Sequence, residues 1–282
     1  MATPVSGLSH GQHLRGARER AFECGGCWYR ARHRRAPVDG RDLLTVRVEP
    51  AAVTDDERPG RSAAVDADRS PDLAAHLRAG VAVFNAGAYL AAHDPWEAAW
   101  LPLDEGPDER LLHGLIQVAA GTHHARTGNA EGATTLAASA RDYLSGLDGH
   151  RGVDLGPVRD WLDAVATDPA AAGERDPPLI RVDDVVLGPG DLEFPAASVA
   201  APHLAAARGD EETADLLRRA ADYGRADLAG GKTESPFVML TLEHLDPDQS
   251  DGLPLARLRD FVQRREQRDA DVAGLFDPGE DE

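Results

Sequence analysis

The chain has 282 residues, enough for one large domain or two smaller ones. It carries 49 acidic against 30 basic residues, a net charge of −19, and Lys232 is its only lysine. This balance argues against sequence-independent nucleic-acid binding, which needs a basic surface. An acidic, lysine-poor chain is typical of a salt-rich cytoplasm, where screening weakens carboxylate repulsion. Because no apolar run approaches the ~18 residues of a membrane span and the start lacks the apolar core of a secretory signal, we expect a cytoplasmic protein.

The N-terminal segment differs in charge from the rest of the chain. Its first 50 residues hold 9 Arg against 5 acidic residues, a net charge of +4, so the remaining residues carry −23. The pairs His10-x2-His13 and Cys24-x2-Cys27 supply four nitrogen and sulfur donors, which suits a tetrahedral zinc site. The alternatives are a disordered tail or a start codon assigned too early. We therefore treat residues 1–69 as a disordered or mis-annotated extension.

Residues 70–168 are expected to form a helical-bundle domain. Ser70-Pro71-Asp72 predicts a helix start, with Ser at the N-cap and Pro at the first helical position. Apolar residues then recur at helical spacing, and short turns separate the stripes. The pattern predicts five helices, over about 72–86, 89–101, 111–128, 129–144 and 155–165.

A linker over 167–178 precedes a mostly helical C-terminal extension, residues 175–282. The stretch "LIRVDDVVLGPGDLEF" predicts two short strands around Asp183-Asp184. Helices are expected from about Ala197, through Leu216 to Leu228, and through Leu255 to Val262. Ser235-Pro236 begins either a further helix or, with Phe237 and Val238, a strand. The expected fold class is all-α.

A polar cluster interrupts two of the predicted helices. On a helix from Tyr89 to Leu101, His93, Glu97 and Trp100 share one face, because residues three and four apart are neighbours. The next helix carries Gln117 and His124 beside its apolar stripe. We therefore predict that His93, Glu97, Gln117 and His124 form an inward-facing cluster.

This cluster has two interpretations. In the first, His93, Glu97 and His124 bind a divalent metal such as Zn or Mn, as in other helical bundles. Glu97 and His93 then supply acid–base catalysis in a hydrolase-like site, and Asn85, Tyr89 and Gln117 contact the substrate.

In the second interpretation, the cluster is a hydrogen-bond network that fixes the helix register in a non-catalytic interaction or small-ligand module. His113, His150 and His203 are expected to be isolated surface residues. The sequence names no cofactor or partner, and a homo-oligomer is compatible with it.

The segments "FNAGAYLAAHDPWEAAW", "LLHGLIQVAAGTHHARTGNAEGA" and "ARDYL" resemble the domain of unknown function 309 family over about residues 72–165. The resemblance rests on the order and spacing of Phe84, Asn85, Gly87, Tyr89, His93, Glu97 and Trp100, and of Leu115, Ile116, Gln117, Ala119, His124, Gly128, Asn129, Gly132 and Ala133. It implies a small all-α bundle in which the polar residues cluster, and it implies no reaction. The acidic composition resembles that of a haloarchaeal-type member.

The chain departs from the family pattern at two positions. Asp94 stands where Glu usually follows the His. Pro95 fits only the first turn of a helix, because an interior proline costs roughly 3 kcal/mol. This places the predicted helix start near Asp94.

Overall fold

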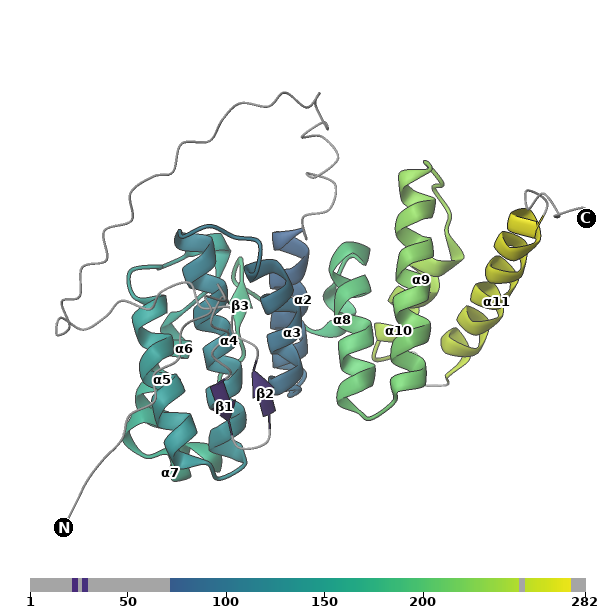
Figure 1. Ribbon diagram of the computed structural model, residues 1–282. Helices are drawn as coiled ribbons and strands as arrows, with labels where there is room; N and C mark the ends of the chain where they lie inside the picture. The colour runs from purple at the N-terminus through teal and green to yellow at the C-terminus, as the bar shows by residue number, and fades with distance from the viewer. Residues whose placement is uncertain (1–21, 25–26, 30–71, 249–251, 275–282) are drawn as a thin grey trace, which may run out of the picture. The chain divides into compact units, whose positions relative to one another are not determined.

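A computed structural model describes residues 22–24, 27–29, 72–248 and 252–274 (Figure 1). The chain divides into two compact units, Met1–Pro59 and Gly60–Glu282. The described part of the first unit is an antiparallel pair of strands, β1 (Phe22–Cys24) and β2 (Cys27–Tyr29). In its register Cys24 pairs with Cys27. The predicted zinc partners His10 and His13, and residues 30–69, lie outside the described residues.

The second unit confirms the five predicted helices of the bundle. They are α2 (Leu73–Asn85), α3 (Tyr89–Trp100), α4 (Pro107–Arg126), α5 (Ala130–Leu144) and α6 (Gly156–Thr167). Successive helices pack against one another through buried apolar faces. The predicted linker instead contains a short helix, α7 (Pro169–Gly173), capped by the side chain of Asp168.

Capping residues set the helix ends, with one change from the prediction. Helix α2 starts at Leu73, and its N-cap is Asp72, whose carboxylate accepts hydrogen bonds from the Ala74 and Ala75 amides at 3.0 and 3.1 Å. The predicted cap, Ser70, lies outside the described residues. Asn129 caps α5 as predicted, because its side chain accepts a hydrogen bond from the Gly132 amide.

Pro95 lies inside α3, so the predicted helix start near Asp94 is wrong. A proline there removes one backbone donor and strains the preceding turn. The Pro95 ring is nevertheless buried, as is Trp96, the next residue in the chain. The fully buried Trp96 indole in turn donates a hydrogen bond to the Leu77 carbonyl of α2 at 3.1 Å. His93 therefore lies within the helix, one turn from Glu97.

The predicted strand pair is confirmed as an antiparallel hairpin of β3 (Arg181–Val182) and β4 (Val185–Val186). Asp183 and Asp184 form its turn with φ of 52° and 64°, the left-handed backbone that a tight two-residue hairpin turn requires. Two 3₁₀ helices flank this region, η1 (His150–Gly152) and η2 (Pro189–Asp191).

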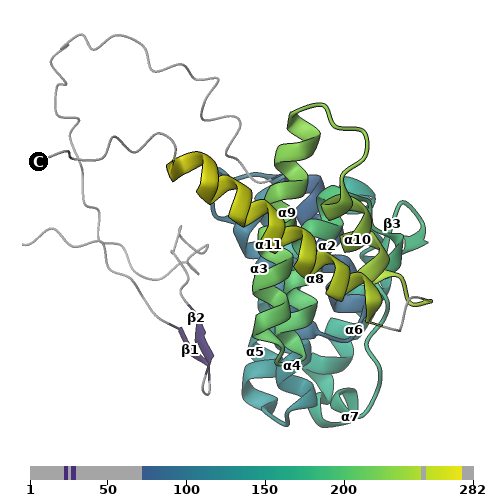
Figure 2. The same cartoon turned by 90° about the vertical axis from the view of Figure 1, so that its right-hand side faces the viewer.

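Four helices complete the second unit: α8 (Phe194–Ala207), α9 (Glu211–Ala229), α10 (Pro236–Leu245) and α11 (Leu253–Gly274). Ser235 is the N-cap of α10, so the helical alternative for this segment is confirmed. Helix α8 packs against α2 and α3 on one side and α9 on the other. Figure 2 shows α11 lying across α9. The regular secondary structure of the described residues is almost entirely helical, which confirms the all-α class.

Among the described residues, no helix combines the length and the apolar character that crossing a membrane would require.

Candidate functional site

Helices α3 and α4 run antiparallel, and two ring contacts fix their register. At one end the Trp100 and His113 rings lie 4.7 Å apart, measured between centroids. At the other end the Arg126 guanidinium lies 5.7 Å from the centre of the Tyr89 ring. Counting inward from both ends places Glu97 of α3 opposite Gln117 of α4. We call His93, Glu97, Glu109, His113 and Gln117 the α3–α4 polar cluster.

His93 is held by its neighbour in the chain. Its Nδ1 lies 2.8 Å from Asp94 Oδ1, and the other Asp94 oxygen lies 3.6 Å from His203 Nδ1 on α8. Burial alone would raise the pKa of Asp94, but the contacts with His203 and His93 hold it well below its ordinary range. Asp94 is therefore a carboxylate that joins two imidazoles and orients His93 Nε2 toward Glu97.

Glu97 lacks a comparably close contact. Its Oε2 lies 3.9 Å from His93 Nε2, beyond hydrogen-bonding distance, and its side chain is 23% exposed. Burial raises the pKa of Glu97 above its ordinary value, the charge of Asp94 raises it further, and His93 offsets part of the shift. The ionised Glu97 is thus a half-buried anion that water still reaches.

The α4 half of the cluster is more completely hydrogen-bonded. The Trp100 indole donates to Glu109 Oε1 at 2.9 Å, and the same oxygen lies 3.5 Å from His113 Nδ1. Gln117 Nε2 lies 3.2 Å from His113 Nε2. An amide nitrogen can only donate, so His113 Nε2 is the acceptor and its proton sits on Nδ1, toward Glu109. Tyr143 of α5 stacks on the His113 ring with centroids 3.9 Å apart.

This arrangement leaves one acceptor without a donor. Gln117 Oε1 is buried and has no hydrogen-bond partner among the described residues. A buried polar atom in this state costs roughly 1–3 kcal/mol unless water or a ligand satisfies it. In the register of α3 on α4 described above, Gln117 lies opposite Glu97.

Three other predicted site residues make contacts outside the α3–α4 polar cluster. His124 lies at the C-terminal end of α4, where its Nδ1 accepts a hydrogen bond from Asn129 Nδ2 at 3.1 Å. Burial, with a smaller contribution from the charge of His123, lowers the pKa of His124. Tyr89 packs edge-on against Phe84. Asn85 binds backbone groups of Ile180 and Leu187.

The sequence reading of three histidines as isolated is wrong. His113 stacks within the cluster, and His203 faces Asp94. His150 Nε2 lies 2.7 Å from Asp108 Oδ1, where Arg151 also binds. His113 could have been recognised, because it stands four residues after Glu109 and four before Gln117. His203 has no such signal, since α8 is remote in sequence.

Among the described residues, no group of three or more His, Cys, Asp or Glu side chains could hold a metal ion. The metal set His93, Glu97 and His124 therefore stays a prediction from the sequence. What the geometry offers is a partly buried face rich in hydrogen-bond acceptors, with an oriented imidazole.

Comparison with known proteins finds the family resemblance in the same region. No curated protein matches the chain. Residues 77–136, which contain His93, Glu97, Gln117 and His124, match the model of the family described as Domain of unknown function (DUF309).

Proposed function

We propose that the α3–α4 polar cluster binds a small ligand that carries an ammonium or guanidinium group. Glu97 is the observation that supports this best. Its carboxylate is partly buried, its pKa is raised, and among the described residues the nearest recorded basic nitrogen is His93 Nε2, at 3.9 Å. A ligand cation would supply the charge-assisted hydrogen bond that Glu97 lacks. Residues whose pKa is shifted in a way that destabilises the ligand-free protein are concentrated at functional sites.

The contrast with Glu109 argues against a purely structural role for Glu97. Glu109 lies on the same face and accepts a hydrogen bond from the Trp100 indole at 2.9 Å, as expected of a residue that fixes helix packing. No hydrogen bond of this kind between the two helices is recorded for Glu97 among the described residues. Gln117, opposite Glu97 in the helix register, contributes a second acceptor, its buried Oε1. Two acceptors that lack a hydrogen-bond donor among the described residues favour a ligand rich in N–H groups.

Titration with n-butylammonium and methylguanidinium chloride tests this proposal. We expect saturable shifts of backbone amide resonances in α3 and α4, and none with acetate. Glu97→Gln should weaken binding by about tenfold or more, since a hydrogen bond to a charged group is worth roughly 1.5–3 kcal/mol. The matched control is Glu131→Gln, an exposed acid in the first turn of α5. Equal affinity of Glu97→Gln and wild type, or no saturable shift with either cation, would overturn the proposal.

A second candidate, acid–base catalysis in a hydrolase-like site, is favoured by the contact between His93 and Asp94. A carboxylate 2.8 Å from Nδ1 orients the opposite nitrogen as a general base. Glu97, with its raised pKa, would be the proton donor. A panel of p-nitrophenyl esters and phosphates, assayed with and without Zn²⁺ and Mn²⁺, tests both the metal-free and the metal-dependent versions. Turnover that disappears in His93→Ala would support catalysis. The absence of turnover under every condition would rule out this second candidate function.

A further inference from the structure

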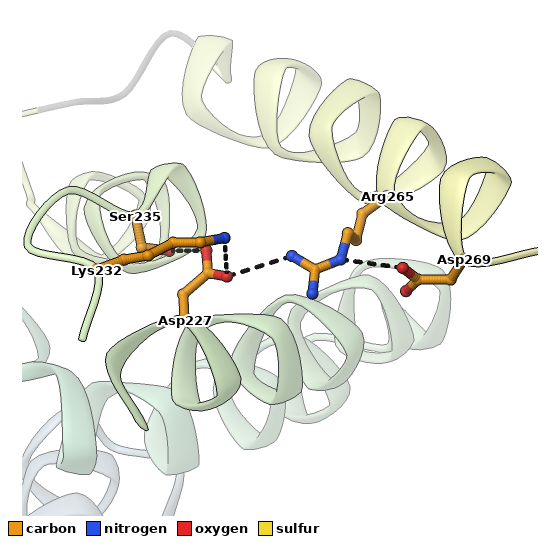
Figure 3. Close-up of polar contacts among 5 residues, drawn as sticks. All are labelled: Asp227, Lys232, Ser235, Arg265 and Asp269. Carbon is orange, nitrogen blue, oxygen red and sulfur yellow. Dashed lines mark hydrogen bonds and ion pairs between the residues drawn. The ribbon is translucent and has the colours of Figure 1, made fainter. Parts of the chain in front are cut away.

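A second polar cluster surrounds Asp227 in the last turn of α9. The Asp227 side chain is only 3% exposed, and its carboxylate accepts three hydrogen bonds (Figure 3). The donors are Lys232 Nζ at 2.6 Å, Ser235 Oγ at 3.0 Å and Arg265 Nη1 at 3.2 Å. They come from the α9–α10 connection, the N-cap of α10 and the middle of α11. We call these four residues the Asp227 lock.

The buried carboxylate depends on these donors. Burial alone would raise the pKa of Asp227, whereas the hydrogen bonds from Lys232, Ser235 and Arg265 hold it below its ordinary value. A buried ion that loses one partner is strongly destabilising, because its desolvation is no longer compensated. The lock therefore holds together only while both of its cations are present.

Arg265 makes the lock relevant to the docking of α11. Leu258 and Val262 of α11 are buried in an apolar core with residues of α9 and α10. The other ion pairs between α11 and α9, such as Arg219 with Glu266, lie at the surface, where such pairs contribute little. Arg265, by contrast, reaches the buried Asp227 and packs over the Tyr223 ring of α9 at 5.1 Å. Arg265 therefore joins α11 to a buried carboxylate of α9.

Lys232 is the accessible and chemically distinctive member of the lock. It is the only lysine in a chain with 30 basic residues. Its side chain is 55% exposed although its ammonium contacts a buried carboxylate. A primary amine can be acylated, whereas the guanidinium groups of the other cations stay protonated and unreactive. A reagent in solution can therefore reach one side-chain amine, and that amine supports α11.

We propose that Lys232 is an acylation site that controls the docking of α11 on α9. The uncharged Nζ attacks the carbonyl carbon of an acyl thioester or acyl phosphate. An amide bond forms, the thiolate or phosphate leaves, and the Nζ proton passes to solvent. The product keeps one N–H but has no charge. Among the described residues, Asp227 then keeps Arg265 as its one cationic partner, so its burial is less well compensated and the segment around Arg265 loosens.

The full-length protein treated with a water-soluble N-hydroxysuccinimide acetate tests this proposal. Peptide mass mapping should find the acetyl group on Lys232 and on the terminal amine. Hydrogen exchange in peptides covering 253–274 should then rise by about tenfold or more, the consequence of losing one charged hydrogen bond. Lys232→Gln should show the same rise without reagent. Lys232→Arg, which keeps the charge and cannot react, should exchange like the untreated protein before and after treatment.

A further variant separates the lock from a general effect of the reagent. In Asp227→Asn the neutral amide no longer needs the ammonium, so acetylation of Lys232 should add little exchange in α11. Three results would overturn the proposal: Lys232 unreacted while the terminal amine is acetylated, Lys232 acetylated with α11 exchange unchanged, or an equal rise in Asp227→Asn and wild type. Far-ultraviolet circular dichroism of each variant confirms that the helices are intact before the comparison.

Discussion

Glu97 and Glu109 lie on the same face of the α3–α4 pair in opposite electrostatic situations. Glu109 accepts the Trp100 indole hydrogen bond and faces the protonated nitrogen of His113. Glu97 has His93 Nε2 at 3.9 Å, and burial raises its pKa. At the scale of single residues, the Glu109 carboxylate contributes to helix packing, whereas the ionised Glu97 carboxylate lowers the stability of the fold. That difference singles out Glu97 within the cluster.

A pH-dependent stability difference should follow from Glu97. Because its folded-state pKa lies above its unfolded value, the folded state binds the proton more tightly, and this stabilising contribution is fully present below the unfolded pKa. It is lost as the pH rises through the folded pKa. We therefore expect Glu97→Gln to raise the free energy of unfolding at pH 7 and to remove the part of the pH-dependent loss that the ionisation of Glu97 causes.

Urea unfolding of both proteins at several pH values measures this difference. Glu131→Gln, at an exposed position, should show no such pH-dependent difference from wild type. A loss of stability in Glu97→Gln at pH 7 would instead mean that the charged carboxylate stabilises the fold, as a structural network requires.

At the scale of elements, Asn85 connects α2 with the segment that contains the β3–β4 hairpin. Its Nδ2 donates to the carbonyls of Ile180 and Leu187, both at 2.9 Å, and its Oδ1 accepts from the Ile180 amide at 2.8 Å. The two backbone positions flank the hairpin, so one side chain holds both ends of it. These hydrogen bonds give Asn85 a structural role that requires no bound ligand.

Asn85→Ala should lower the free energy of unfolding by about 1–3 kcal/mol for each backbone group left buried and unsatisfied. Chemical denaturation measures the loss, and hydrogen exchange of the Ile180 amide locates it. Binding of the cationic probes to α3 and α4 should be unchanged in the folded variant. If the Asn85→Ala variant were as stable as wild type but bound the probes more weakly, this prediction would be contradicted, and Asn85 would instead contact the substrate as the sequence predicts.

At the scale of the whole molecule, charge is the dominant feature. The net charge of −19 implies mutual repulsion of carboxylates in the folded state. Salt screens such repulsion, since the Debye length falls from about 10 Å at 0.1 M to about 3 Å at 1 M. We expect Tm to rise steeply as NaCl is added over this range and then to level off.

Differential scanning calorimetry from 0.1 to 3 M NaCl distinguishes screening from a general salting-out effect. Screening is nearly complete at 1 M, whereas preferential exclusion continues to raise Tm linearly and is much stronger with sulfate. A Tm that does not change below 1 M would show that the acidic surface does not limit stability at low salt.

The helices of the bundle could be predicted because their signals are local. Apolar spacing and caps act within one or two turns, and Asn129 and Ser235 begin helices as expected. The turn at Asp183-Asp184 is likewise local, since short polar residues tolerate the left-handed backbone. The predicted helix start near Asp94 was wrong because the sequence shows the local cost of Pro95 but does not show that its ring is buried in the folded protein.

By itself, the sequence determined the helical class, most of the element boundaries and the presence of His93, Glu97 and Gln117 within one short region. Only the tertiary structure decided which polar groups have partners. Within the described part of the chain, the register of α3 on α4 gives Glu109 a donor, whereas the nearest recorded nitrogen to Glu97 lies 3.9 Å away. The packing of α8 brings His203 to Asp94. Such pairings depend on contacts between helices, and helical periodicity carries no information about them.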